Sequence, residues 1–341
     1  MSTNKYPESI NTALKTMDAG NYNESLTLLK EVIKSEDFLK LTLKEQLFIR
    51  KRTSWVQLSL GYYEDGWKNF VFNWLKNSHK FENILKQNNK IKYLISFDQL
   101  KQGEQLLIWN DGGFGDFIFQ LRLLEFFDKK IKFKIFDNKM SHLIREKNLI
   151  TSSAADFDWH LPVNEIPRLI NFNSKRHNNF NFNYLIKPSN KFIMYNDYIG
   201  ISFKTETDPS KSIDYKLLKK LFKNKKNLKF LILQKNLNKD EKNFFSSFDN
   251  VRFINDLDSS LLFEDTFNII SSVNFMITID TAIAHISGYL CKKSFLLLQN
   301  PSSFYWGFES KRSTDYKKYH LIRQSKRGDW ISVINDLINL I

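Results

Sequence analysis

A short glycine-rich stretch presents a carboxylate directly after a turn. The sequence 107-LIWNDGGFGDFIFQLRLLEFF-127 contains three of the eleven glycines of the chain, Gly112, Gly113 and Gly115, followed by Asp116. An apolar run precedes the glycines and an amphipathic run follows them, as where a strand turns into a helix. Glycine permits positive φ and close approach to the backbone, and the free N–H groups of a helix start favour an anion. Asp116 is therefore either a carboxylate facing a cleft or a simple helix cap.

This glycine turn fits neither of the two common phosphate-binding motifs. A dinucleotide site requires G-x-G-x-x-G, and the third glycine is missing after Gly113 and Gly115. The lysine of a Walker A motif is absent as well. The sequence therefore does not predict NAD binding.

A second candidate group follows the apolar run 275-FMITI-279. Asp280 and Thr281 come directly after this run, and Ala282 and His285 lie in the helical pattern that continues from it. Thr281 and His285 are four positions apart, so a helix places them on one face. A hydroxyl and free N–H groups at a helix start suit a phosphate. The alternative is that Asp280 is an N-cap and His285 a satisfied core histidine.

A third candidate group lies on a polar loop and at the end of a further strand. The stretch 200-GISFKTETDPSKSI-213 carries Lys204, Lys211 and Ser212, and Gln234 ends another strand. Lysines and hydroxyls at the carboxyl end of a strand suit a phosphate or pyrophosphate. A generic solvated loop is the alternative. The sequence shows no Cys/His cluster with metal-ligand spacing and no nucleophile elbow, so no metal site is expected.

From about residue 100 onward, short apolar runs alternate with amphipathic helical patterns. This alternation predicts βαβ units and parallel sheets, which would position these residues. Strands are expected at residues 105–109, 131–136, 157–163, 198–203, 228–233, 251–254, 274–279, 294–298 and 320–323. Helices are expected at residues 116–127, 139–147, 214–223, 239–247, 261–272, 281–290 and 330–341. The polar stretch 171–190 separates two halves. We therefore predict two doubly wound α/β domains, residues 96–190 and 191–341, with a ligand cleft at the carboxyl ends of their strands.

The N-terminal region, residues 1–95, has helical periodicity and no strand-like alternation over most of its length. Two helical patterns flank Gly20-Asn21-Tyr22, and a second pair, 43–60 and 68–77, flanks a turn in which Tyr62 matches Tyr22. This order resembles tetratricopeptide (TPR) repeats. Two units are fewer than a free-standing solenoid needs, so the module is expected to lean on the next domain. An ordinary helical bundle is the alternative.

Composition excludes several classes of protein. The net charge is +14, but basic residues are spread from Lys5 to Arg327. The densest run, 216–229, has helical spacing with lysines on its solvated face, so nucleic-acid binding is not expected and anionic small molecules are favoured partners. The single cysteine, Cys291, excludes an intramolecular disulfide and suits a reducing cytoplasm. No apolar run approaches the roughly 18 residues of a membrane span, and we read no secretory signal.

The order of the motifs resembles a known family. A TPR-like region, a strand leading to Gly-x-Gly-Asp and a strand ending in Asp-Thr-Ala-x-x-His are similar to the TPR-fused relatives of glycosyltransferase family nine. This family is the ADP-heptose:lipopolysaccharide heptosyltransferase group. Further matching stretches are Gly66-Trp67, 158-DWHLPVNEIPRL-169, Gly200-Ile201-Ser202, Gln234-Lys235, and Arg323-Gln324 to Gly328-Asp329-Trp330.

The resemblance implies a GT-B fold, in which two Rossmann-like domains face a cleft, here preceded by a small all-α TPR-like module. It implies inverting, metal-independent sugar transfer without a cofactor, with Asp116 as the general base for the acceptor hydroxyl. The implied partners are a nucleotide-sugar donor, a glycan or protein acceptor, and a protein bound by the TPR-like module. The implied donor-binding residues are Lys204, Lys211, Ser212, Gln234, Asp280, Thr281, Ala282 and His285.

Three positions depart from the family pattern, one of them Ala282, where the family commonly has glycine or serine. Phe114 stands where the family usually has leucine, and Asp111 where relatives often have glutamine. These departures leave the sugar, the nucleotide and the acceptor open. The alternative function is a non-catalytic scaffold of the same fold that binds a protein or glycan partner.

Overall fold

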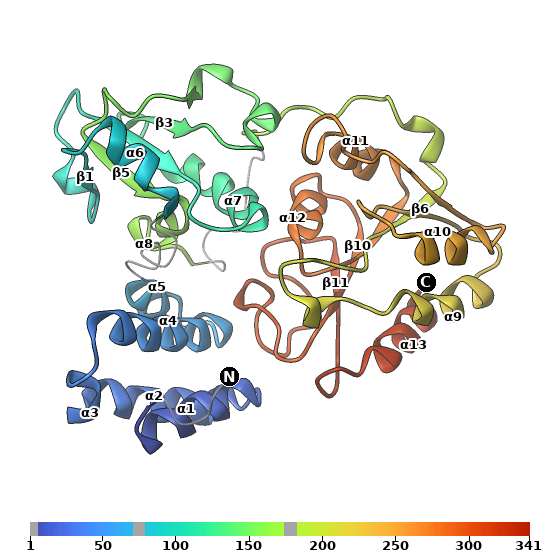
Figure 1. The fold of residues 1–341 in the computed structure, drawn as a ribbon, viewed down its shortest axis with the longest axis horizontal. Helices are drawn as coiled ribbons and strands as arrows, with labels where there is room; N and C mark the ends of the chain where they lie inside the picture. Colours follow the sequence, from blue (N-terminus) through green and yellow to red (C-terminus); the bar gives the residue numbers. More distant parts are fainter. Residues whose placement is uncertain (1–5, 71–78, 174–182) are drawn as a thin grey trace.

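The computed structural model describes residues 6–70, 79–173 and 183–341. Its parts are an N-terminal helical module, a first parallel sheet and a second parallel sheet (Figure 1). In Figure 1 the module lies at the lower left, the first sheet above it, and the second sheet to the right. The module packs against both sheet domains, through α5 (Tyr63–Asn69) on α8 (Ile166–Leu169) and through α4 (Leu43–Ser59) on the 3-10 turn η10 (Phe304–Trp306).

The helical module consists of paired helices that bury one apolar face each. Its helices are α1 (Glu8–Asp18), α2 (Tyr22–Lys34), α3 (Glu36–Leu39), α4 (Leu43–Ser59) and α5 (Tyr63–Asn69). Helix α1 packs on α2, α2 on α4, and α4 on α5. Apolar residues at helical spacing, such as Ile10, Ala13 and Met17 of α1, form the buried seam.

The two turns of the module are alike. Gly20 and Gly61 end the preceding helices with φ of +85° and +84°, a left-handed conformation that suits glycine. Tyr22 and Tyr63 then begin the next helices, so Tyr63, and not Tyr62 as the sequence suggested, is the counterpart of Tyr22. Helix α5 also begins earlier than the predicted range 68–77, most of which lies outside the described residues. The TPR assignment stays a prediction.

The first sheet is parallel throughout and has the strand order β1-β5-β2-β3-β4. Its strands are β1 (Lys92–Tyr93), β2 (Gln105–Trp109), β3 (Lys132–Phe136), β4 (Ile150–Thr151) and β5 (Trp159–Pro162). Its helices are α6 (Glu82–Gln87), α7 (Phe114–Leu121) and α8 (Ile166–Leu169). Leu106 and Ile108 pack on one face in the cluster that includes α7, whereas Leu107 and Trp109 pack with α6 on the other. Burial on both faces explains the unbroken apolar run of β2.

Several elements of this half differ from the sequence-based expectation, and the short strand β4 and the helices α6 and α8 were not predicted. The strand β1 was not predicted, since two residues carry no readable period. The helix predicted at 139–147 is wrong: two 3-10 turns, Ser141–Leu143 and Lys147–Leu149, replace it. Asn138 explains the difference, because its side chain accepts the Met140 N–H and its own N–H donates to Ser141 Oγ. Such local bonds compete with helix formation.

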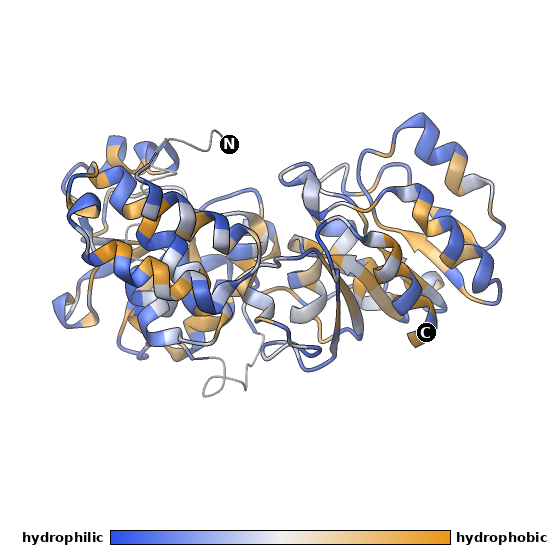
Figure 2. Ribbon diagram, turned by 90° about the horizontal axis from the view of Figure 1, so that it is seen from below, coloured by the Kyte–Doolittle hydropathy of each residue, from blue (hydrophilic) through white to orange (hydrophobic). Residues whose placement is uncertain are grey.

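The second sheet is parallel throughout and confirms the predicted alternation. Its strands are β6 (Tyr198–Ile201), β7 (Lys229–Ile232), β8 (Val251–Phe253), β9 (Phe275–Ile279), β10 (Ser294–Leu298) and β11 (Tyr319–Arg323). Its helices are α9 (Leu218–Asn224), α10 (Lys239–Ser246), α11 (Glu264–Ser272), α12 (Ala282–Tyr289) and α13 (Trp330–Leu340). Phe230 and Ile232 pack with α9 and α13, whereas Leu231 and Leu233 pack with α11. Helices therefore cover both faces, and Figure 2 shows apolar residues gathered along the strands and inward helix faces.

Strand order locates the ligand crevice of each sheet. The second sheet runs β11-β10-β9-β6-β7-β8, so the chain reverses direction across the sheet between β6 and β9. In the first sheet the corresponding reversal lies between β2 and β5. Open α/β sheets bind ligands at the carboxyl ends of the strands beside such a reversal. Among the described residues, no helix is long and apolar enough to cross a membrane.

Candidate functional site

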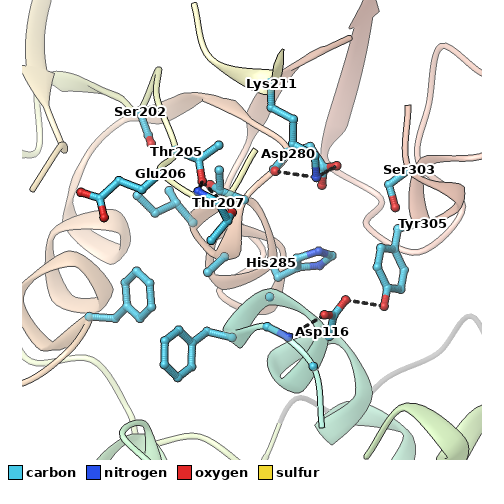
Figure 3. A pocket seen from close by; sticks show the side chains of 18 of the residues that line it. Asp116, Ser202, Thr205, Glu206, Thr207, Lys211, Asp280, His285, Ser303 and Tyr305 are labelled. Carbon is cyan, nitrogen blue, oxygen red and sulfur yellow. Dashed lines mark hydrogen bonds and ion pairs between the residues drawn. The ribbon is translucent and has the colours of Figure 1, made fainter. Parts of the chain in front are cut away.

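Both strand-order reversals open into one cleft of about 680 Å³ between the sheets. The first sheet contributes the turn after β2, and the second contributes the segments after β6 and β9 (Figure 3). The predicted site residues that line the cleft are Gly112, Gly113, Gly115, Asp116, Lys204, Lys211, Gln234, Asp280, Thr281, Ala282 and His285. Segments far apart in the chain thus converge on one volume large enough for a ligand of nucleotide-sugar size.

Asp116 both caps its helix and faces the cleft. Its Oδ2 accepts the Gly113 N–H at 2.8 Å, and its Oδ1 accepts the Tyr305 hydroxyl at 2.7 Å (Figure 3). A carboxylate oxygen can accept more than one hydrogen bond, so each retains acceptor capacity. The two readings of Asp116 from the sequence are therefore compatible, because the cap fixes the carboxylate in place.

The three glycines of the turn after β2 leave space for neighbouring side chains and have ordinary backbone conformations. The expectation of positive φ is wrong for Gly112, Gly113 and Gly115, since none is among the glycines with positive φ. A Cβ on Gly112 would lie 2.7 Å from Asp116 Oδ2, and a Cβ on Gly115 would lie 2.9 Å from His285 Cδ2. Gly115 is thus where α7 and α12 meet, and the N-termini of both helices reach the cleft.

Gly115→Ala should destabilise the protein by about 1–3 kcal/mol, because overpacking at a tight contact forces the two helices apart. The added Cβ would also lie 3.4 Å from the backbone of Ala282, which cannot rotate away. Gly113→Ala is the matched control, since its Cβ meets only Asp116 Oδ2, at 3.4 Å. We expect less than about 1 kcal/mol for the control in urea unfolding. Equal losses for both variants would contradict close contact at Gly115.

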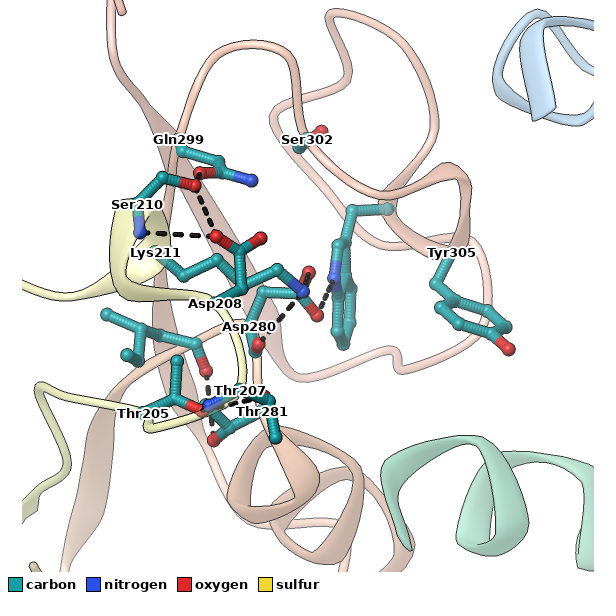
Figure 4. A network of polar contacts seen from close by, with 12 residues as sticks. Thr205, Thr207, Asp208, Ser210, Lys211, Asp280, Thr281, Gln299, Ser302 and Tyr305 are labelled. Carbon is teal, nitrogen blue, oxygen red and sulfur yellow. Dashed lines mark hydrogen bonds and ion pairs between the residues drawn. The ribbon is translucent and has the colours of Figure 1, made fainter. Parts of the chain in front are cut away.

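Asp280 is held by a lysine and a tryptophan (Figure 4). Lys211 Nζ lies 2.7 Å from Asp280 Oδ2, and Trp306 Nε1 donates to Oδ1 at 2.8 Å. Burial alone would raise the pKa of Asp280, but the charge and hydrogen bond of Lys211 outweigh it and the pKa is lowered. Asp280 is therefore ionised. Thr281, and not Asp280, is the N-cap of α12, so the capping alternative for Asp280 is wrong.

His285 is buried among aromatic rings. Its ring stacks on Trp306 at 5.1 Å, and its Nδ1 lies 3.0 Å from the Tyr316 hydroxyl. Burial lowers the pKa of His285 to about 3, so the ring is neutral near pH 7. It therefore shapes the cleft wall and adds no positive charge for a phosphate, which agrees with the core-histidine alternative.

The polar loop after β6 is braced by its own side chains. Lys204 Nζ bonds both carboxylate oxygens of Glu241, at 2.7 and 2.6 Å, and the Lys204 N–H donates to Gln234 Oε1 at 3.1 Å. Ser212 does not line the cleft: its hydroxyl accepts the Thr205 N–H at 2.9 Å and donates to the Thr205 carbonyl at 3.2 Å. Both predicted lysines thus line the cleft and are paired with a carboxylate, Lys204 with Glu241 and Lys211 with Asp280.

Several cleft residues escaped the sequence analysis. Tyr305 lines the cleft and contacts Asp116, Trp306 contacts Asp280 from behind the lining, and the helical module contributes Lys51, Trp55 and Phe70 to the lining. The dense aromatic run 303-SFYWGF-308 was a visible signal, but an aromatic run is more often core than site. Nothing in helical periodicity indicates which module residues reach a distant cleft.

Asp111 is a second carboxyl in the turn after β2. It is fully buried, and its Oδ1 accepts both the backbone N–H and the side-chain amide of Asn164, each at 3.1 Å. Burial raises the pKa of Asp111 to about 7, although the Asn164 bonds oppose the rise. Asp111 and Asp116 both line the cleft, but Asp111 is fully buried and bonded to Asn164, whereas Asp116 is half-buried.

No group of three or more His, Cys, Asp or Glu side chains within residues 6–70, 79–173 and 183–341 gathers closely enough to hold a metal ion. The site's charged groups are instead arranged in pairs and caps, as described for Asp116, Lys211 and Asp280.

Comparisons with solved structures give distant matches. The E. coli heptosyltransferase WaaC with ADP is 11% identical, with a TM-score of 0.44 over 69% of this chain and 99% of that one. The family 9 glycosyl transferase from Veillonella parvula is 8% identical, with a TM-score of 0.45 over 71% and 95%. The E. coli ADP-heptose heptosyltransferase II is 10% identical, with a TM-score of 0.39 over 69% and 99%. No protein-family model and no curated protein matches the sequence.

Proposed function

We propose that this protein is a glycosyltransferase that moves a sugar from a nucleotide-sugar donor to a hydroxyl of a glycan or protein acceptor. One observation carries the proposal: Asp116, from the first sheet, and the Lys211–Asp280 pair with the N-terminus of α12, from the second, line the same cleft. The first side offers a proton acceptor and the second a cation and free N–H groups. Group transfer to a hydroxyl with an anionic leaving group needs both.

Each side of the cleft supplies one part of the proposed reaction. An acceptor oxygen attacks the anomeric carbon of the donor and loses its proton to Asp116. The bond from that carbon to the diphosphate oxygen breaks on the opposite face, so the configuration inverts. The negative charge that develops on the leaving diphosphate is stabilised by Lys211 and by the N–H groups at the start of α12. Transfer by this route requires no metal ion or cofactor.

Two further assignments belong to the same proposal. The two parallel sheets facing a cleft are assigned to the GT-B type, and the paired helices with their glycine turns to the TPR type. The donor is placed against the second sheet and the acceptor against the first and the helical module. The exposed single cysteine, Cys291, suits the cytoplasm, which is where we place the protein.

A thermal-shift screen against ADP, UDP and GDP and their sugars tests the proposal. At about 100 times its Kd a ligand stabilises the folded state by about 2.7 kcal/mol. One nucleoside diphosphate family should therefore raise Tm by several degrees, and Lys211→Met, with its weaker affinity, should reduce that shift to about half or less at the same ligand concentration. A screen in which no nucleotide raises Tm would favour the scaffold alternative.

A further inference from the structure

Three consecutive residues in the loop after β10 contact three different parts of the molecule. Phe304 packs on the helical module, Tyr305 donates to Asp116, and Trp306 donates to Asp280. We refer to residues 304–306 as the aromatic segment. It joins the helical module to both carboxylates of the site within one turn of 3-10 helix.

The contact with the helical module is an aromatic cage around Phe304. The ring of Phe304 meets Trp55 edge-on at 5.3 Å, Trp67 at 5.7 Å and Phe70 at 6.2 Å. Phe304 is 8% exposed, and Trp67 and Phe70 are 3% and 6% exposed, so these three rings are largely removed from water. Edge-to-face packing of this kind fixes the position of a ring as well as burying it.

Tyr305, the residue after Phe304, contacts the site directly. Its hydroxyl lies 2.7 Å from Asp116 Oδ1, and its ring lies 4.4 Å from that of Phe119 of α7. Burial, together with the nearby carboxylate of Asp116, raises the pKa of Tyr305 well above its usual value. The hydroxyl therefore keeps its proton and acts as the donor.

The backbone of the aromatic segment is clamped from the second sheet. The guanidinium of Arg323, at the end of β11, donates to the carbonyls of Trp306 at 2.7 Å and Gly307 at 3.1 Å, and to Ser310 at 3.0 Å. The segment is thus fixed at one end by Arg323 and at the other by the cage. Loss of either anchor would let Tyr305 move.

We propose that Tyr305 is a positioning residue for Asp116 and that the helical module, by holding Phe304, is a required part of the active site. The catalytic part of this inference rests on the proposed function. The module would then act on the reaction through contact and would not be a separable unit for binding partners. A rigid carboxylate matters because an error of about 1 Å in the position of a catalytic group can lower a rate about 100-fold.

The test compares Phe304→Leu and Tyr305→Phe with Phe308→Leu in the full-length protein. Phe308 is a matched control, because it lies in the same loop and contacts the same module through Tyr22, at 5.0 Å. It has no contact with either carboxylate among the described interactions. Tyr305→Phe removes one oxygen and leaves the ring, so it separates positioning from folding.

Hydrogen exchange of the peptide 112–121 is the first measurement and requires no substrate. It reports the Gly113 N–H that Asp116 accepts. We expect Phe304→Leu and Tyr305→Phe to raise exchange there roughly tenfold, as for the weakening of one hydrogen bond to a carboxylate, and Phe308→Leu to leave it unchanged. Equal exchange in Phe304→Leu and Phe308→Leu would overturn the inference.

Steady-state kinetics are the second measurement. Phe304→Leu and Tyr305→Phe should each lower kcat by about 10- to 100-fold while the affinity for nucleoside diphosphate stays the same. A loss of affinity equal to the loss of kcat would contradict a positioning role. If exchange rises as expected but the unsubstituted protein turns over no nucleotide sugar, the proposed function fails while the positioning of Asp116 by the helical module stands.

Discussion

Asp116→Asn should lower the turnover of sugar transfer by about 100- to 10,000-fold, the range that a general base contributes. Asparagine is nearly the same size, and its one carbonyl oxygen can still accept the Gly113 N–H while its NH2 group donates to the Tyr305 hydroxyl oxygen, so the glycine turn should keep its geometry. It cannot take a proton from an acceptor hydroxyl. Nucleoside diphosphate affinity should therefore be unchanged by calorimetry while kcat falls.

Asp111→Asn is the control for this experiment. It replaces a carboxylate in the same turn that is enclosed and bonded to Asn164. We expect a smaller effect on kcat than for Asp116→Asn. Equal turnover in Asp116→Asn and the unsubstituted protein would remove Asp116 from the role of base.

Lys211→Met should have the largest effect on stability and on donor binding. The ammonium lies 2.7 Å from Asp280, whose side chain is 7% exposed, so its loss leaves a buried charge for which Trp306 is the one remaining side-chain donor within the described part of the chain. Removing one partner of a buried pair costs about 3–5 kcal/mol, and we expect about 2–3 kcal/mol since Lys211 is itself 24% exposed. Nucleoside diphosphate affinity should fall by about 10-fold or more with the loss of a charged hydrogen bond.

The pH dependence of the stability loss in Lys211→Met shows whether the broken ion pair causes it. The pKa of Asp280 is lowered in the folded protein, so its contribution to stability is present above the unfolded pKa of about 3.9 and is lost as pH falls through the lowered value. In Lys211→Met, no ammonium offsets the burial of Asp280, so the pKa of Asp280 should be raised and its carboxyl should become protonated in acid. The loss of stability relative to the unsubstituted protein should therefore become smaller as the pH falls. Lys211→Met combined with Asp280→Leu should recover stability but not affinity. A deficit that is constant between pH 7 and 4 would exclude the ion pair as the cause.

The sheets could be predicted from the sequence because their strands are buried on both faces. Continuous apolar runs such as Phe275–Ile279 and Ser294–Leu298 stand out against a lysine-rich background, and each was placed within one residue of its observed bounds. The range 139–147 was mispredicted for a local reason: apolar spacing favoured a helix, but side-chain bonds at Asn138 favoured tight turns. Two-residue strands such as β1 have no period to detect.

The candidate site was predictable only in part. Asp280, directly after β9, and Asp116, at the start of the helix that follows β2, were found because the carboxyl ends of parallel strands meet at one edge. Tyr305 and Trp306 were missed, because their directions depend on a loop whose backbone is fixed by Arg323, on another strand. The contribution of the helical module depends on tertiary packing around Phe304, which no local pattern encodes.

The central claim is that the cleft transfers a sugar from a nucleotide donor with Asp116 as its base. Release of nucleoside diphosphate from a panel of ADP-, UDP- and GDP-sugars, with water or added glycan as acceptor, tests it most directly. The account predicts that the unsubstituted protein releases one diphosphate at a rate about 100-fold or more above Asp116→Asn, although both bind it equally. No release from any donor, or equal release by the two proteins, would contradict the account.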